Sequence, residues 1–451
     1  MAAHNTSNLQ LHTSYRQILS IALPIAAAIV VPQLNFITNN IFLGHLSEAS
    51  LAAAGITGVY YLVFAVIGYG LNNGLQSLIS RRAGENRPEE IGKLFIQGVY
   101  ITLAIAAVGI IISYTLGPII LKQTLHDPVI YNSAVSFLKI RIWGLPFLYI
   151  YQMRNALLVG TNNSRYLVSG TLAETLTNIG LDYLLIFGSL GFPKLGFNGA
   201  AIASVIAEII GMSVVFLVVH NKGIGKQFSL LKHRAFDGTI CKLVLTQSSP
   251  LILQYGVSVA CWEFFYILIE HHGARDLAVS NTMRNIFGLF GCASWAFAAT
   301  STTMVSNIIG QGLQDQVLEL VKKIAKLSVL IGFSLAVLLN VFPHIFLSIY
   351  GQGDDFIEYA TPVLRIVSIA LVCMSFSTIW LNAITGTGNT RVNLAIEIFT
   401  ITLYCIYVWL VLEKWRLPIT IGWTSELLYW ISMFSFSYWY LRSGKWRNKK
   451  I

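Results

Sequence analysis

The sequence reads GTNNSR at residues 160–165 and GTGNTR at residues 386–391, which lie 226 positions apart. The same offset aligns other positions well upstream of these two turns. The further pairs are Pro24 with Pro250, Ala52 with Ala278, Ser80 with Ser306, and Gly84 with Gly310. Each match is weak by itself, but one constant offset across four expected helices indicates an internal repeat. The sequence therefore predicts two homologous halves.

Composition decides the environment of these halves. The chain has 451 residues, of which 55% are hydrophobic and only 11% are charged, and its mean hydropathy is +0.65. Soluble domains usually carry about 25% charged residues. The composition therefore excludes a soluble protein of this length and predicts an all-α membrane protein that crosses the bilayer many times.

Apolar stretches of about 20 residues predict the membrane-spanning helices. Twelve such stretches are present, six in each half. They are 16–43, 52–80, 93–116, 130–159, 166–190, 197–219, 243–270, 278–306, 324–348, 357–385, 392–412 and 418–441. Because six is an even number, both halves enter the membrane from the same side. The halves are thus predicted to be six-helix bundles related by a pseudo-twofold axis along the membrane normal.

The basic residues predict the topology and the lobe boundaries. Of the 30 lysines and arginines, 20 fall in the N-terminal segment, the even-numbered connections and the C-terminal tail. By the positive-inside rule both termini are cytoplasmic, and the net charge of +10 is a topology signal rather than a nucleic-acid site. The longest connection predicts an N-terminal lobe at 1–219, a cytoplasmic linker at 220–242 and a C-terminal lobe with a basic tail at 243–451.

The fifth expected span carries three polar residues on one helical face, Glu174, Asn178 and Asp182. Placing an ionised Asp at the centre of a bilayer costs roughly 2.5–3.5 kcal/mol on insertion scales. Such a residue therefore suggests a function, although buried polar groups also serve only to join helices. Glu174 is expected closer to the cytoplasmic interface.

Five further motifs resemble the multidrug and toxic compound extrusion (MATE) family of cation-coupled exporters over almost the whole chain. No single one is diagnostic, but their order and spacing match, together with the two GT-x-N turns. They are LP at 23–24, IFLGHL at 41–46, LAAAG at 51–55, SRRAGEN at 80–86 and LGFNGAA at 195–201. The resemblance implies two bundles in a V, exchange of inward H⁺ or Na⁺ for an outgoing organic compound, and no enzymatic activity. Consistently, the sequence contains no Gly-Lys-[Ser/Thr] nucleotide-binding loop.

One position departs from the family pattern. Many prokaryotic members carry an Asp 15 residues after the bend proline of the first helix, whereas this chain has Asn39, followed by Asn40. An amide neither binds nor releases a proton, although its carbonyl can ligate Na⁺. The resemblance therefore implies that a first-helix carboxyl does not carry the coupling proton in this protein.

The cation-coupling site is predicted from the fifth and sixth spans. Asn178 and Asp182 match the family's Asn-x-x-x-Asp pair, and Ser204 lies near a position where members carry a hydroxyl. Because a medium of low dielectric disfavours an unpaired carboxylate, Asp182 could take up a proton on one side and release it on the other. The same oxygens, with that of Asn39, are also suitable Na⁺ ligands, so the coupling ion stays open.

A second cation or substrate site is expected in the C-terminal lobe. Glu263 in the seventh span resembles the membrane Glu of eukaryotic members, and Arg284, with Asn281 near the same face, could neutralise it. Glu270, His271 and His272 are consecutive, so their side chains diverge and predict a solvated rim rather than a metal site.

Other charged residues in apolar spans are expected to pair, or alternatively to face the cavity. The glutamates are Glu208, Glu397 and Glu426, and the arginines available to them are Arg141, Arg154 and Arg365. No cofactor is expected apart from transported H⁺ or Na⁺, and the expected partners are organic small molecules, the coupling cation and membrane lipid.

The sequence thus favours a monomeric antiporter of organic cationic or amphipathic compounds in a prokaryotic inner membrane. A flippase for a lipid-linked precursor is the alternative from the wider superfamily. Such a flippase would require a large cationic cavity and often additional helices.

Overall fold

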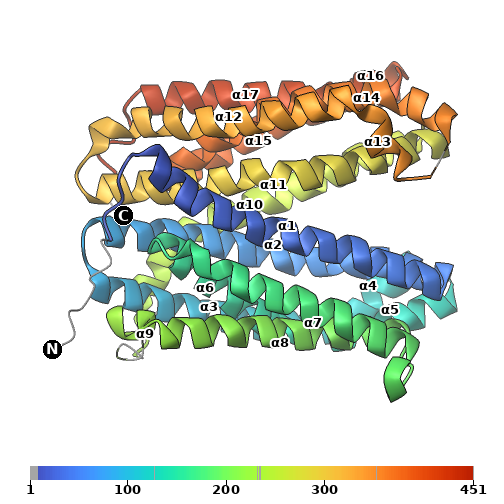
Figure 1. Ribbon diagram of the computed structural model, residues 1–451, viewed down its shortest axis with the longest axis horizontal. Coiled ribbons are helices and arrows are strands. Elements are labelled where there is room, and N and C mark those ends of the chain that lie inside the picture. Colours follow the sequence, from blue (N-terminus) through green and yellow to red (C-terminus); the bar gives the residue numbers. More distant parts are fainter. Residues whose placement is uncertain (1–8, 126, 231, 233–234, 352, 450–451) are drawn as a thin grey trace. The chain divides into compact units, whose positions relative to one another are not determined.

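The computed structural model describes residues 9–125, 127–230, 232, 235–351 and 353–449 (Figure 1). This part of the chain is helical and contains no strand. Its first half comprises α1 (Tyr15–Leu46), α2 (Glu48–Gly84), α3 (Pro88–Thr115), α4 (Gly117–Thr124), α5 (Pro128–Arg141), α6 (Leu145–Gly160), α7 (Leu167–Phe187), α8 (Phe197–Asn221) and α9 (Ile224–Gln227). Its second half comprises α10 (Gly238–Glu270), α11 (Ala274–Gly310), α12 (Val317–Val341), α13 (Pro343–Ser348), α14 (Asp354–Gly386), α15 (Thr390–Val408), α16 (Ile419–Gly422) and α17 (Ser425–Arg442).

Each of the twelve predicted spans falls on a long helix or on a pair of helices. In the described part of the chain, nine segments are long and apolar enough by composition to cross a membrane. The helices α7, α11 and α17 are not among these nine and complete the twelve. The polar residues of α7, which include Asn178 and Asp182, lower its hydropathy, so composition alone misses the helix that carries these two residues.

Local chemistry explains where several helices begin and bend. Asp127 caps α5, because its side chain accepts hydrogen bonds from the backbone N–H of Val129 and Ile130. The predicted span 130–159 is interrupted by a 3₁₀ turn at Ile142–Gly144, and Pro146 lies in the first turn of α6 that follows. Proline is favoured there because the first turn of a helix leaves its N–H groups unpaired.

The chain divides into two compact units whose boundaries differ from the predicted lobes. The N-terminal unit comprises residues 27–252, and the C-terminal unit comprises residues 1–26 and 253–451. The predicted linker at 220–242 therefore belongs to the N-terminal unit. There Gln97 on α3 donates to the carbonyl of Ala235 at 2.8 Å and accepts from the backbone N–H of Asp237 at 3.2 Å.

Residues 9–13 belong to the C-terminal unit because hydrogen bonds fasten them to α11. Asn307 accepts from the Leu11 N–H and donates to the Leu9 carbonyl, both at 2.9 Å, and Gln311 donates to the Leu11 carbonyl at 3.0 Å. These bonds satisfy the backbone of a segment that has no secondary structure of its own. The beginning of α1 therefore packs with the second half of the chain.

Within each unit the helices pack side by side (Figure 1). In the N-terminal unit α7 packs along α8, and α6 packs against both α2 and α3. In the C-terminal unit α14 packs against α11, α12 and α17, and α15 packs against α17. The polar clusters described below lie between these packed helices.

Candidate functional site

A polar cluster in the N-terminal unit joins three helices at Asn178. The side-chain nitrogen of Asn35 on α1 lies 2.8 Å from the Asn178 amide oxygen, and the Asn178 nitrogen lies 3.3 Å from the Ser204 hydroxyl on α8. Asn178 is buried, and it lies one helical turn before Asp182 on α7. The structure therefore brings together the predicted residues Asn178, Asp182 and Ser204.

Asn178 satisfies more of its neighbours when the oxygen and nitrogen of its amide exchange places. In that orientation its nitrogen donates to Asp182 Oδ2 at 3.2 Å and to Asn35 Oδ1 at 3.0 Å, and its oxygen accepts from the Ser204 hydroxyl at 3.3 Å. An amide has both donors and acceptors, so it can serve both neighbours at once. Asn178 is thereby the hydrogen-bond partner of Asp182.

The Asp182 carboxyl is nearly free of other contacts. Its residue is 1% exposed, and Oδ1 is buried with no hydrogen-bond partner among the described residues. Arg141 is the charged group whose field reaches Asp182, but its guanidinium is bonded to Glu208. A buried carboxyl with one free oxygen and no ion pair is better accommodated in its protonated form, because the ionised form loses its hydration without compensation.

Asn39 lies one turn beyond Asn35 on α1, and its side-chain oxygen is also buried without a partner among the described residues. The structure thus connects α1 to the cluster through Asn35, which the sequence analysis did not single out. The spacing of Asn35 and Asn39, four residues apart on one helical face, is the signal that could have identified it. Asn40 lies in α1, but its side chain is outside the described residues.

A close approach of α7 and α8 positions this cluster. A Cβ atom added at Gly199 would lie 2.6 Å from the Leu185 carbonyl oxygen, so the backbones of the two helices meet where only glycine fits. Gly188 follows α7 with φ +73°, a left-handed conformation that ends the helix. The short connection then returns the chain as α8, which carries Ser204.

Glu208 in the same unit is neutralised by an arginine, as predicted. Arg141 donates to both oxygens of Glu208, at 2.6 and 3.0 Å, and Tyr61 donates to Glu208 at 3.3 Å. The guanidinium also lies 3.9 Å from the centre of the Tyr61 ring. Paired and hydrogen-bonded in this way, both charges are stable away from water. Arg154 instead donates to the Met212 carbonyl.

Glu397 on α15 has a different environment, and the prediction of an arginine partner is wrong for it. Its residue is 1% exposed. Oε1 accepts from the Ser258 hydroxyl at 2.6 Å and from the Tyr429 hydroxyl, whereas Oε2 accepts from the Gln254 amide at 3.4 Å. All three donors are neutral, and the described residues provide no ion pair to Glu397.

The prediction of an arginine partner is also wrong for Glu426 on α17. Its residue is 2% exposed. Oε2 accepts from the Trp430 indole N–H at 3.0 Å, and Oε1 accepts from Trp262 at 3.4 Å and Tyr404 at 3.3 Å. Trp430 lies one turn further along α17, whereas Trp262 and Tyr404 come from α10 and α15, which the sequence could not place beside Glu426.

Glu263 and Arg284 face each other as expected, but the pair is loose. The closest nitrogen and oxygen are 3.9 Å apart, and the two side chains are 37% and 41% exposed. The guanidinium lies 5.3 Å from the centre of the Tyr266 ring. Asn281 is exposed on α11. The two charges are thus close but not held in a tight ion pair.

The expected rim residues lie at the end of α10. The Nδ1 atom of His271 lies 2.9 Å from a carboxyl oxygen of Glu413, and Nε2 of His272 lies 2.9 Å from the Leu412 carbonyl oxygen. Glu270 is exposed. The three side chains thus have separate surroundings, consistent with a solvated rim.

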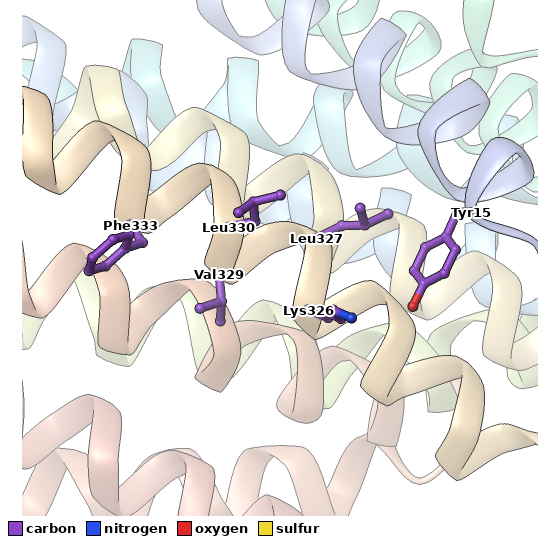
Figure 2. A pocket seen from close by; sticks show the side chains of 6 residues that line it. All are labelled: Tyr15, Lys326, Leu327, Val329, Leu330 and Phe333. Atoms are coloured by element: carbon purple, nitrogen blue, oxygen red, sulfur yellow. The ribbon is translucent and has the colours of Figure 1, made fainter.

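A groove of about 430 Å³ lies beside α12 on the C-terminal unit. Figure 2 shows the six side chains that line it. Tyr15 and Lys326 lie at one end of it and Phe333 lies at the other, with apolar residues between them. Leu330 and Phe333 are 62% and 57% exposed. Exposed apolar side chains on a membrane-spanning helix can pack against lipid chains. None of the polar-cluster residues described above lines this groove.

Comparison with known proteins finds the same internal repeat. The MatE family model matches residues 24–184 and 250–410, two ranges that are offset by the same 226 residues. This chain belongs to the MatE family. The family members compared below are transporters, so this MatE protein is a membrane transporter and not an enzyme.

Two curated relatives span most of this MatE protein, and both are named probable multidrug resistance protein NorM. The one from Thermotoga maritima is 22% identical over 443 residues, which are 97% of this chain and 94% of the relative. The one from Synechocystis is 25% identical over 394 residues, which are 84% of each protein.

Solved structures share the fold of this MatE protein. A MATE structure in complex with MaL6 has a TM-score of 0.89 at 17% identity and covers 97% of this chain and 99% of its own. A mutant of the Vibrio cholerae MATE transporter VcmN has a TM-score of 0.88 at 18% identity, with 96% and 98% covered. The chain therefore has the architecture of twelve transmembrane helices in two bundles.

Proposed function

We propose that this MatE protein exports organic compounds, cationic or amphipathic, in exchange for protons that enter the cell. The two bundles would alternate access to opposite sides of the membrane, as repeat-built transporters do. The multidrug resistance names of its NorM relatives support this substrate class. The basic residues that predict cytoplasmic termini support the orientation.

Asp182 is the proposed proton carrier, and one observation carries this assignment. Its carboxyl is 1% exposed, and Oδ1 has no partner among the described residues. Burial favours the protonated form, and contact with water during opening would favour release of the proton. The neutral amide of Asn178 can accept from the acid or donate to the carboxylate, so it serves both states.

Sodium coupling is the second candidate, and the same cluster supports it. Oδ1 of Asp182 and Oδ1 of Asn39 are both buried oxygens without a donor among the described residues, and Na⁺ prefers oxygen ligands. Asn178 and Ser204 would complete the set. Substrate transport driven by a Na⁺ gradient at constant pH would favour this candidate over proton coupling.

Exchange measurements in proteoliposomes test the proposal. Asp182→Asn should abolish proton movement driven by a substrate gradient, while Asp182→Glu should retain part of it. Glu174→Gln is the matched control, because it removes a carboxyl two turns earlier on the same face of α7. Full proton exchange in Asp182→Asn would remove Asp182 from the mechanism.

A further inference from the structure

The C-terminal unit holds two glutamates that are as deeply buried as Asp182 but lie outside the site proposed above. Glu397 and Glu426 are 1% and 2% exposed. Neither forms an ion pair within the described residues. Transferring an ionised carboxyl into an apolar medium without a counter-charge is so unfavourable that the group takes a proton instead. The charge balance of this region therefore requires at least one bound proton.

The two carboxyls belong to one polar cluster, which we call the α15–α17 cluster and which contains Glu397, Glu426, Tyr404 and Tyr429. Tyr429 donates to Glu397, and Tyr404 donates to Glu426. The two tyrosine rings are in contact, with centroids 5.8 Å apart. The two glutamates are therefore linked through their tyrosine partners, and each carboxyl has its own hydroxyl donor.

The hydrogen bonds distinguish the two carboxyls. Glu426 accepts from the indole N–H groups of Trp262 and Trp430, which are donors only. Indole donors on both oxygens favour the ionised form of Glu426 and also leave no oxygen shell for a metal cation. Glu426 is therefore the carboxyl that accepts hydrogen bonds in its ionised form, and it is not the residue that holds the proton.

The hydrogen-bond donors of Glu397 are distributed differently over its two carboxyl oxygens. Both strong donors, Ser258 and Tyr429, lie on Oε1, while Oε2 meets only the Gln254 amide at 3.4 Å. A proton on Oε2 would convert that contact into an O–H donor to the amide oxygen, once the Gln254 amide has turned over. Gln254 and Ser258 lie one turn apart on α10, and both are half-buried.

The other titratable groups around the cluster do not supply a cation. They are Cys261 and Tyr266 of α10, Cys405 of α15, and Arg284 of α11, which acts on Tyr266. Arg284 is directed to Glu263 and the neighbouring rings, and Arg365 of α14 has no ion pair with either glutamate in the described structure. None of these groups forms an ion pair with Glu397 or Glu426 within the described residues.

We propose that Glu397 is a second exchangeable proton-binding site, with the proton on Oε2. Uptake converts the Glu397 carboxylate into the carboxylic acid, and release on the other side of the membrane restores the carboxylate. No other bond forms or breaks. As a part of transport this inference rests on the proposed antiport, whereas the binding of the proton itself does not.

Infrared spectroscopy of the purified full-length protein tests the site without transport. A protonated carboxyl has a carbonyl stretching band that an ionised carboxylate lacks. Measured in an Asp182→Asn background at neutral pH, this band should be present and should disappear when Glu397→Gln is added. Glu319→Gln, at an exposed position of α12, is the matched control and should leave the band unchanged. An identical band with and without Glu397→Gln would overturn the proposal.

A second variant keeps the test decisive if Glu397→Gln does not fold. Tyr429→Phe removes a hydrogen bond to Glu397 and should shift the frequency of the band. An unshifted band in Tyr429→Phe would contradict the assignment. Loss of the band on addition of Na⁺ alone at constant pH would likewise overturn it, because it would identify a metal cation as the ligand.

Transport then tests the coupling. In proteoliposomes, Glu397→Gln should halve the number of protons moved per substrate molecule, because Asp182 remains. An unchanged ratio would overturn a role of Glu397 in coupling. If the unmodified protein moves no protons with substrate, the proposed function fails, and the infrared band still decides whether Glu397 binds a proton.

Discussion

Glu208 and Glu397 are both buried glutamates of membrane-spanning helices, but they are stabilised in opposite ways. Glu208 is held as an anion by two hydrogen bonds from Arg141. Glu397 meets only neutral hydroxyl and amide donors. An ion pair fixes the charge of a carboxyl, whereas neutral donors leave it free to gain or lose a proton. The first arrangement suits a structural role and the second suits transport.

The two halves also differ at positions that the repeat makes equivalent. The offset of 226 residues places Tyr404 at the position of Asn178 and Val408 at that of Asp182. Glu397 corresponds to Thr171, whose hydroxyl contacts Tyr151 at 2.8 Å. The halves therefore share a fold but hold their acids in different places, because a fold repeat constrains packing more strongly than it constrains polar chemistry.

Breaking the ion pair of Glu208 should have the largest effect on stability. Arg141→Met leaves a buried carboxylate without its partner, and we expect it to lower the free energy of unfolding by about 3–5 kcal/mol. Denaturant titration in micelles measures the change. The double variant Arg141→Met with Glu208→Gln should recover most of the loss. A single variant as stable as the parent protein would show that the pair is not needed to hold Glu208.

Separating α7 from α8 should have an intermediate effect. Gly199→Ala forces a methyl group against the Leu185 carbonyl, and we expect a loss of about 1–3 kcal/mol because the helices must move apart. Gly180→Ala is the control on α7, since its new methyl group meets no atom within 4 Å. Equal thermal midpoints for the two variants would argue against the close approach.

Removing one neutral donor from Glu397 should have the smallest effect. Tyr429→Phe deletes a hydrogen bond while keeping the ring, and we expect a loss of about 1 kcal/mol. The thermal midpoint in detergent measures it, with Tyr440→Phe near the end of α17 as the control. A loss as large as that of Arg141→Met would mean that Glu397 is ionised and depends on Tyr429 as Glu208 depends on Arg141.

Much of this architecture follows from the chain alone. Runs of apolar residues located the twelve spans, because the bilayer imposes a minimum length on any helix that crosses it. The repeated GT-x-N turns gave the offset that the family comparison also has. Helical periodicity placed Asn178 and Asp182 on one face, and the structure joins that face to Ser204.

The sequence alone could not show which side chains form hydrogen bonds or ion pairs with each buried polar group. The sequence offered three arginines to the three glutamates without saying which would pair, and it gave no sign that tryptophans and tyrosines would surround Glu426. It also passed over Asn35, although Asn35 contacts Asn178 directly. The contacts of Asn35 with Asn178 and of Trp262 with Glu426 join residues 143 and 164 positions apart, and the packing of separate helices decides them.

The sequence by itself therefore determined the number of spans, the repeat, the family and the helical face that carries Asp182. These features depend on composition and on local periodicity, which every stretch of chain displays. Only the tertiary structure decided which carboxyls are neutralised by arginine and which by neutral donors. That distinction depends on the atoms that surround each oxygen, and helices from distant parts of the chain supply them.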